Sequence, residues 1–183
     1  MNNNLPHINS NTTLFIDRDG VINKEKYNDY IHTWDEFIWH DGVLNAFEIF
    51  AKKFKHIIIV TNQRGVAKGL TTLQNLQTIH KNMQATIEAN GGRITAIFFC
   101  IDMDATSPNR KPNIGMALQA KQQFADIDFN NCYMVGNTLS DMQFGKSIQA
   151  TTIFLPTTKP EINEAHHLVD AVYPSLFAFA QDV

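Results

Sequence analysis

Two aspartates, Asp17 and Asp19, leave a short apolar run, residues 14–16 (Leu-Phe-Ile), together and are followed by Gly20. Of two carboxylates at this spacing, one can attack phosphorus and the other can carry the proton of the leaving group. Both need a cation nearby because adjacent anions repel each other. The same letters also suit an ordinary turn, since Asp and Gly favour turns.

A second polar motif, Thr61-Asn62-Gln63-Arg64-Gly65, follows the apolar residues 57–60. A hydroxyl and exposed backbone N–H groups at the end of a strand can hold phosphate oxygens. Taken alone, the motif also fits a loop with no ligand.

A third motif, Arg110-Lys111-Pro112, offers positive charge. Lys111 can stabilise both a phosphate and a carboxylate nucleophile. Pro112 suits the first position of a helix, so we predict that a helix follows directly. A solvated helix start is the alternative for this motif.

The fourth motif runs from Gly136 to Asp141 (Gly-Asn-Thr-Leu-Ser-Asp) and follows the apolar residues 132–135. Oxygen ligands here could complete the coordination of Mg²⁺, which prefers carboxylate and water oxygens. Asn137 could instead act as a helix N-cap, and the two roles are compatible.

The elements that must position these motifs alternate along the chain. Continuous apolar runs predict buried parallel strands, and amphipathic stretches between them predict helices. We therefore predict an α/β fold, a Rossmann-like three-layer αβα sandwich with a mainly parallel sheet and a minimal cap or none. The predicted strands are residues 12–17, 55–61, 95–100, 131–136 and 151–155, and the predicted helices are residues 42–54, 71–90, 113–124, 139–148 and 173–181. Each motif then lies at the carboxyl edge of the sheet.

In this order the motifs resemble the haloacid-dehalogenase-like (HAD) phosphatase superfamily, and most of all its small, nearly capless branch that includes histidinol-phosphate and heptose-bisphosphate phosphatases. The matching segments are FIDRDGVIN, VTNQRGVAKG, RKPNIGM and YMVGNTLSDMQFG, between about Thr13 and Leu155. The resemblance implies a Mg²⁺-dependent phosphatase that acts on a small phosphorylated metabolite, a sugar phosphate or a compound of the histidinol-phosphate type, through an aspartyl-phosphate intermediate.

The resemblance also implies a role for each matching position. Asp17 would be the nucleophile, Asp19 the general acid and base, and Lys111 the stabilising cation. Thr61 and Asn62 would bind phosphate. Arg110 would contact the leaving group. Asp17, Asp19 (through its backbone carbonyl) and Asn137 would bind the metal, and Asp141 would support the metal site.

Two departures from the family pattern matter. The fourth motif usually begins Gly-Asp, whereas here it reads Gly136-Asn137, and an amide oxygen brings no charge to the metal. This motivates an alternative, a binding or regulatory protein on the same fold with weakened catalysis. The zinc loop of many relatives is reduced to Cys100, and one thiolate does not make a structural zinc site, so we expect no zinc.

Composition sets the remaining expectations. The 183 residues carry a formal net charge of −3, and without a basic stripe we expect no nucleic-acid partner. We expect residues 1–11 to be a disordered or loosely packed leader and residues 12–183 to form a single domain. With no signal peptide or membrane-spanning run, we expect a cytoplasmic protein, monomeric or homo-oligomeric. The aromatic residues between 27 and 39 could line a pocket mouth or pack that segment down.

Overall fold

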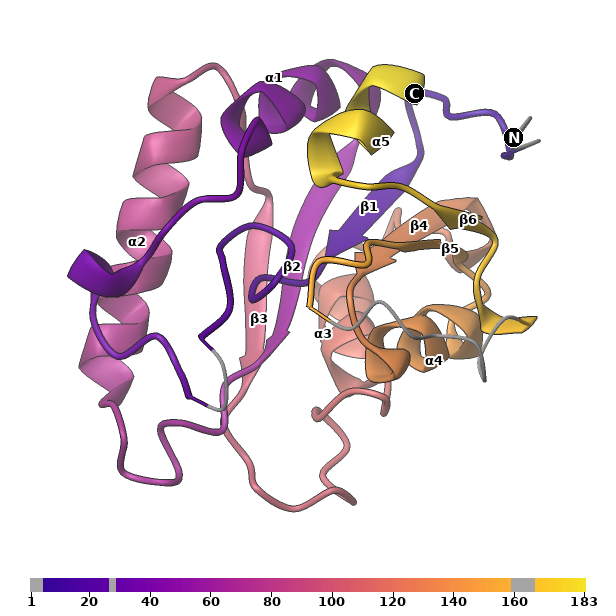
Figure 1. Ribbon diagram of the computed structural model, residues 1–183. Coiled ribbons are helices and arrows are strands. Elements are labelled where there is room, and N and C mark those ends of the chain that lie inside the picture. Colours follow the sequence, from indigo (N-terminus) through magenta and orange to yellow (C-terminus); the bar gives the residue numbers. More distant parts are fainter. Residues whose placement is uncertain (1–4, 27–28, 159–166) are drawn as a thin grey trace.

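The computed structural model describes residues 5–26, 29–158 and 167–183. Within these residues, six strands form one parallel sheet in the order β3-β2-β1-β4-β5-β6 (Figure 1). The strands are β1 (Thr13–Ile16), β2 (His56–Asn62), β3 (Ala96–Cys100), β4 (Cys132–Gly136), β5 (Thr151–Phe154) and β6 (Ala171–Val172). The predicted α/β fold is confirmed.

Helices cover both faces of the sheet and give the predicted three layers (Figure 1). One face is covered by α1 (Val43–Lys53), α2 (Leu73–Ala89) and α5 (Leu176–Asp182), and the other by α3 (Gly115–Gln123) and α4 (Leu139–Ser147). The short 3₁₀ helices η1 (Trp34–Glu36) and η2 (Phe129–Asn131) lie in the connections.

Strand β1 shows why continuous apolar runs occur in this sequence. Leu14 and Ile16 belong to the core beneath α1, α2 and α5, whereas Phe15 belongs to the core beneath α3 and α4. Successive side chains of a strand point to opposite faces, so a strand covered on both sides is a nearly continuous apolar run, here Leu14, Phe15 and Ile16. All four residues of β1 are fully buried.

The boundaries differ from the prediction mainly near the chain end. Strand β6 was not predicted, because two residues are too few for a periodic pattern. The last helix begins at Leu176 rather than at Tyr173, since the Ser175 hydroxyl accepts a hydrogen bond from the backbone N–H of Ala178 and caps the helix there. Helix α2 is capped at Thr72, whose hydroxyl accepts a 3.0 Å hydrogen bond from the backbone N–H of Asn75.

The segment between β1 and α1 folds back on itself beside the strand ends. Backbone hydrogen bonds join Lys24 to Ile38 at 2.7 Å and His40 to Ile22 at 3.0 Å. The aromatic residues of this segment divide between the two expected roles. Trp34, Phe37 and Trp39 pack against one another, whereas Tyr30 lines a cleft. Tyr27 lies outside the described residues.

The first described residues contact the domain. Leu5 and Ile8 pack partly buried against the core, and the Tyr133 hydroxyl donates a hydrogen bond to the Pro6 carbonyl. The expected leader, residues 1–11, and the single domain remain predictions. Across the described parts of the chain, none of the helices has the length and apolar character needed to cross a membrane.

Candidate active site

The functional motifs meet at the carboxyl edge of the sheet. Strand β1 lies between β2 and β4, so Asp17, which follows β1, is flanked by Thr61 of β2 and by Asn137, which follows β4. The strand order reverses direction between β1 and β4, which is where doubly wound sheets open a crevice. A cleft of about 320 Å³ opens here, and its charged lining consists of Asp17, Asp19, Glu25, Lys26, Asp29, Arg64, Arg110, Lys111 and Asp141.

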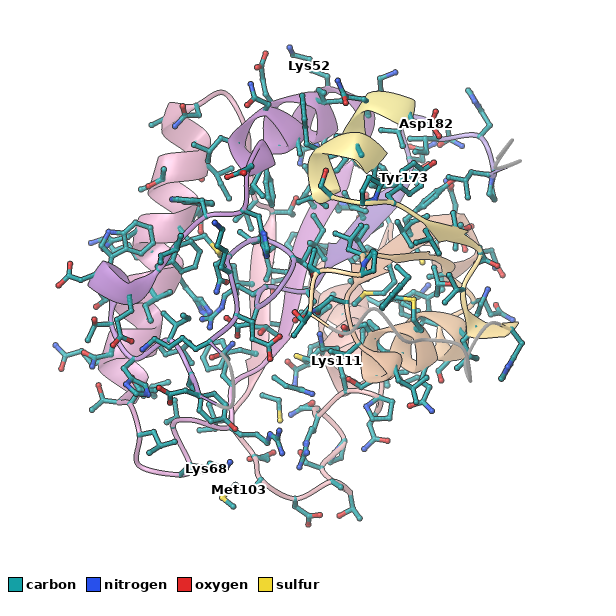
Figure 2. All side chains as sticks on the ribbon, viewed as in Figure 1. Lys52, Lys68, Met103, Lys111, Tyr173 and Asp182 are labelled. Carbon is teal, nitrogen blue, oxygen red and sulfur yellow. The ribbon has the colours of Figure 1, made fainter. Side chains whose placement is uncertain are left out.

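Lys111 lies at the base of the cleft, beyond the strand ends (Figure 2). Its Nζ is 2.8 Å from Oδ1 of Asp17 and 2.6 Å from Oδ1 of Asp141, and it donates a 2.7 Å hydrogen bond to the Val60 carbonyl. Lys111 is 3% exposed and Asp141 is fully buried. One cation therefore serves two carboxylates in a region of low solvent access.

Burial and charge act against each other on these groups. Burial raises the pKa of Asp17 to about 7, with a further contribution from Asp141, although the Lys111 charge opposes the shift. Burial would lower the pKa of Lys111, but the charges of Asp141 and Asp17 outweigh it and raise that pKa, so Lys111 stays protonated.

Asn62 fixes the backbone that carries Lys111. Its Oδ1 accepts a 3.0 Å hydrogen bond from the backbone N–H of Lys111, and its Nδ2 donates a 3.1 Å bond to the Lys111 carbonyl. The side chain of Asn62 thus orients the cationic residue, and its predicted contact with phosphate remains a prediction. Our placement of Pro112 at a helix start is wrong, because residues 110–113 form a turn and α3 begins at Gly115.

Asp19 is held by three donors. Its carboxylate accepts hydrogen bonds from Arg18 at 2.7 Å, from Asn23 Nδ2 at 2.9 Å and from Gln63 Nε2 at 2.8 Å. Burial favours a higher pKa for Asp19, but the Arg18 charge and these hydrogen bonds outweigh it and lower the pKa. Arg18 is itself fully buried, 3.4 Å from Nε2 of His80 on α2.

Asn137 is fully buried, and only one of the two polar atoms of its side-chain amide has a hydrogen-bond partner among the described residues. Its Nδ2 donates a 2.8 Å hydrogen bond to the Thr158 hydroxyl, whereas its Oδ1 is buried without a hydrogen-bond partner among the described residues. A buried amide oxygen left free in this way costs free energy unless a ligand satisfies it. The N-cap role considered for Asn137 is wrong, because Thr138 caps α4 and Asp141 completes its capping box.

These groups fit a Mg²⁺ ion. The oxygens expected to bind it are a carboxylate oxygen of Asp17, the backbone carbonyl of Asp19 and the free Oδ1 of Asn137, all of the hard oxygen type that Mg²⁺ prefers. Nowhere in residues 5–26, 29–158 and 167–183 do three or more His, Cys, Asp or Glu side chains form a metal-binding group.

The other predicted residues lie around the same cleft. The Thr61 hydroxyl accepts a 2.8 Å hydrogen bond from Gln63 Nε2, and Arg110 donates to the Met103 carbonyl while lining the cleft. Sequence reasoning missed Arg18, Asn23 and Gln63 as partners of Asp19. All three lie inside the segments that carry the family resemblance, so their polar character beside buried strands was the available signal.

The loop that resembles a reduced zinc loop is held by hydrogen bonds. The Cys100 thiol lies 3.6 Å from Oδ2 of Asp102, which also accepts a hydrogen bond from the Ser107 hydroxyl. Asn113 Nδ2 ties the same loop down through a 2.9 Å bond to the Ser107 carbonyl. The expectation that zinc is absent remains a prediction.

Solved structures and curated relatives are similar to this chain over most of its length. D,D-heptose 1,7-bisphosphate phosphatase from B. bronchiseptica, solved with magnesium and phosphate, aligns with a TM-score of 0.83 and 28% identity over 93% of this chain and 97% of that one. D-glycero-β-D-manno-heptose-1,7-bisphosphate 7-phosphatase from Escherichia coli K12 is 32% identical over 179 residues, 93% of this chain and 92% of the relative. The Salmonella typhi enzyme of the same name is 33% identical over 172 residues, covering 89% and 90% of the two chains.

The fold, the edge site and these relatives define a phosphoric monoester hydrolase of the HAD type. A family profile described as polynucleotide kinase 3 phosphatase matches residues 11–170. The chain belongs to this family, and among named proteins it resembles the heptose bisphosphate phosphatases.

Proposed function

We propose that this phosphatase hydrolyses a sugar phosphate with Mg²⁺ through an aspartyl-phosphate on Asp17. The observation that carries the proposal is the position of Lys111, whose Nζ contacts both Asp17 and Asp141 at the base of an open cleft. Asp17 combines a carboxylate, partial burial and an adjacent cation, which is the environment that a nucleophile attacking an anionic phosphate requires.

In the first half-reaction, an oxygen of Asp17 attacks phosphorus and the bond from phosphorus to the sugar oxygen breaks. Asp19, which takes up a proton against its lowered pKa before this step, delivers that proton to the departing oxygen, while Lys111 and the Thr61 hydroxyl offset the charge on the phosphoryl oxygens. A bound Mg²⁺ would supply further neutralisation of the phosphate charge and hold it against Asp17. In the second half-reaction, Asp19 removes a proton from the water that attacks the aspartyl-phosphate.

The rim of the cleft favours a substrate with more than one anionic group. Lys26, Arg64 and Arg110 line it in addition to Lys111, although Glu25 and Asp29 lie there too. Arg64 forms no ion pair within the described residues, so its charge is available to a ligand. A sugar bisphosphate, the substrate named for the relatives, matches this chemistry.

The test is phosphate release from a panel with and without Mg²⁺. The panel contains D-glycero-β-D-manno-heptose 1,7-bisphosphate, histidinol phosphate and a 3′-phosphorylated oligonucleotide, the last because of the family description. We expect multiple turnovers on the sugar bisphosphate that need both the metal and Asp17. Asp17→Asn removes the nucleophile, and the exposed Asp35→Asn is the matched control, which keeps full activity. Turnover that survives Asp17→Asn would refute the aspartyl-phosphate route.

Asn137 supports a second candidate function, ligand binding with weak or no turnover. If wild-type protein releases no phosphate from any compound but Asn137→Asp does, the natural protein is a binding protein on a phosphatase fold. We further propose a cytoplasmic location, which suits two buried free cysteines, Cys100 and Cys132.

A further inference from the structure

Gln63 links the phosphate-binding strand to the acid–base residue. It directly follows β2, is 3% exposed, and uses one amide nitrogen for two hydrogen bonds. Nε2 donates to Oδ2 of Asp19 at 2.8 Å and to Oγ1 of Thr61 at 2.8 Å. A carboxylate can only accept here, so the amide nitrogen must face Asp19, and both N–H groups of Gln63 are used.

The bond to Thr61 fixes the direction of its hydroxyl hydrogen. A hydroxyl has one hydrogen to donate and two lone pairs to accept with. Because Gln63 donates to Thr61, the Thr61 hydrogen cannot point at Gln63 and is free for an acceptor in the cleft. A phosphate oxygen is such an acceptor, so the bond prepares Thr61 as a donor before the substrate arrives.

The bond to Asp19 fixes the distance between two parts of the site. Arg18 and Asn23 belong to the same loop as Asp19, so their hydrogen bonds hold the carboxylate within that loop. Gln63 comes from the end of β2 instead, and its bond sets Asp19 relative to the strand that carries Thr61. A proton donor in phosphoryl transfer must be held to a fraction of an ångström for full effect.

We propose that Gln63 is a positioning residue for phosphoryl transfer, which orients the Thr61 hydroxyl toward the phosphate and holds Asp19 in line with the leaving group. This inference rests on the proposed function. It assigns to Gln63 no contact with the reacting atoms. The alternative is a purely structural role for Gln63. Loss of its side chain would then lower the amount of folded enzyme without changing the ratio of kcat/KM between two substrates.

The test compares two leaving groups in one enzyme sample. Gln63→Met keeps the length of the side chain and removes both donors. A sugar alkoxide leaves poorly and needs a proton, whereas p-nitrophenolate leaves without one, so loss of Asp19 positioning affects the sugar phosphate more. We expect kcat/KM for D-glycero-β-D-manno-heptose 1,7-bisphosphate to fall by about 10- to 100-fold, as for other supporting residues, and the ratio of kcat/KM between it and p-nitrophenyl phosphate to fall at least about fivefold.

Because both substrates share one enzyme sample, the ratio does not depend on the folded fraction. Gln84→Met on α2, where the Gln84 side chain bonds to Glu88, is the control and leaves the ratio unchanged. Thr61→Val should lower kcat/KM for both substrates by the same factor. Gln63→Met should lower kcat/KM less in the Thr61→Val variant than in the wild type, since the two residues act together.

An unchanged ratio in Gln63→Met, or losses from Gln63→Met and Thr61→Val that multiply independently, would overturn the inference while leaving the proposed function intact. Failure of the wild type to hydrolyse either ester would refute the proposed function, and the role of Gln63 with it.

Discussion

Gly20 tests the placement of Asn137 more directly than a substitution of Asn137 itself. Gly20 has a φ of +78°, and a Cβ added there would lie 2.0 Å from Asn137 Nδ2 and 2.7 Å from Thr158 Oγ1. Non-bonded atoms rest about 3.5 Å apart or more, so the amide would have to move by more than about 1 Å. Asn137 is fully buried and has little room to do so.

The expected cost of Gly20→Ala has two parts. The left-handed backbone costs an L-residue about 1–2 kcal/mol, and overpacking a filled site costs about 1–3 kcal/mol more. Gly69 separates them, because its φ is +70° and an added Cβ would meet nothing within 4 Å. Gly69→Ala should therefore lose only the backbone part of the free energy of unfolding.

Urea unfolding of both variants measures these losses, and a Mg²⁺ titration of activity measures the effect on the metal site. We expect Gly20→Ala to be about 1–3 kcal/mol less stable than Gly69→Ala, and to need at least about tenfold more Mg²⁺ for half-maximal activity. Equal stability losses together with an unchanged Mg²⁺ requirement would show that Asn137 does not lie against Gly20, and the reasoning about the metal site would fail.

Three further predictions concern charged or titratable groups. Lys111→Met should lower kcat by at least about 10²-fold, against no change in the exposed Lys68→Met, as measured by phosphate release; retained activity would remove Lys111 from the mechanism. Burial and the nearby Arg18 charge lower the pKa of His80 from 6.5 to about 3, so the unfolded chain binds more protons than the folded one between these values and stability falls as pH drops below 6.5. From pH 7.5 to 5.5, urea unfolding should show wild type losing about 1.4 kcal/mol more than His80→Gln, and equal losses would contradict a buried neutral His80. Asn137→Asp should lower the Mg²⁺ concentration for half-maximal activity but also lower the melting temperature in EDTA, and a variant more stable than wild type in EDTA would contradict the charge argument.

The sequence predicts best the features that a residue pattern determines on its own. Buried strands such as β1 read directly from continuous apolar runs, because both faces of the sheet are covered. The edge site followed from the order of the motifs, since parallel strands deliver their ends to one edge. Strand β6 could not be predicted from the sequence, because a two-residue strand is defined by its pairing with β5 rather than by its own residue pattern.

The hydrogen-bond partners in the site were beyond sequence reasoning for a different reason. Gln63 and Asn62 are adjacent and both polar. Gln63 hydrogen-bonds to Asp19 and Thr61, whereas Asn62 hydrogen-bonds to the backbone of Lys111. Which neighbour each amide reaches depends on the alternation of side chains at the end of β2 and on where the Lys111 loop returns. Both depend on the tertiary structure and are not determined by the local sequence.

The charge balance of the cleft gives Asn137 a physical rationale other than decay. The Arg18 guanidinium already neutralises Asp19, and Lys111 faces both Asp17 and Asp141, which leaves negative charge in excess at the base of the cleft whenever Asp17 is ionised. A carboxylate at position 137 would add another buried negative charge whenever the metal is absent, at a cost in stability. An amide keeps an oxygen for the cation, the Oδ1 that has no other partner among the described residues, and adds no charge to an empty site. On this argument Asn137 exchanges metal affinity for stability without the metal, which is the exchange that Asn137→Asp would reverse.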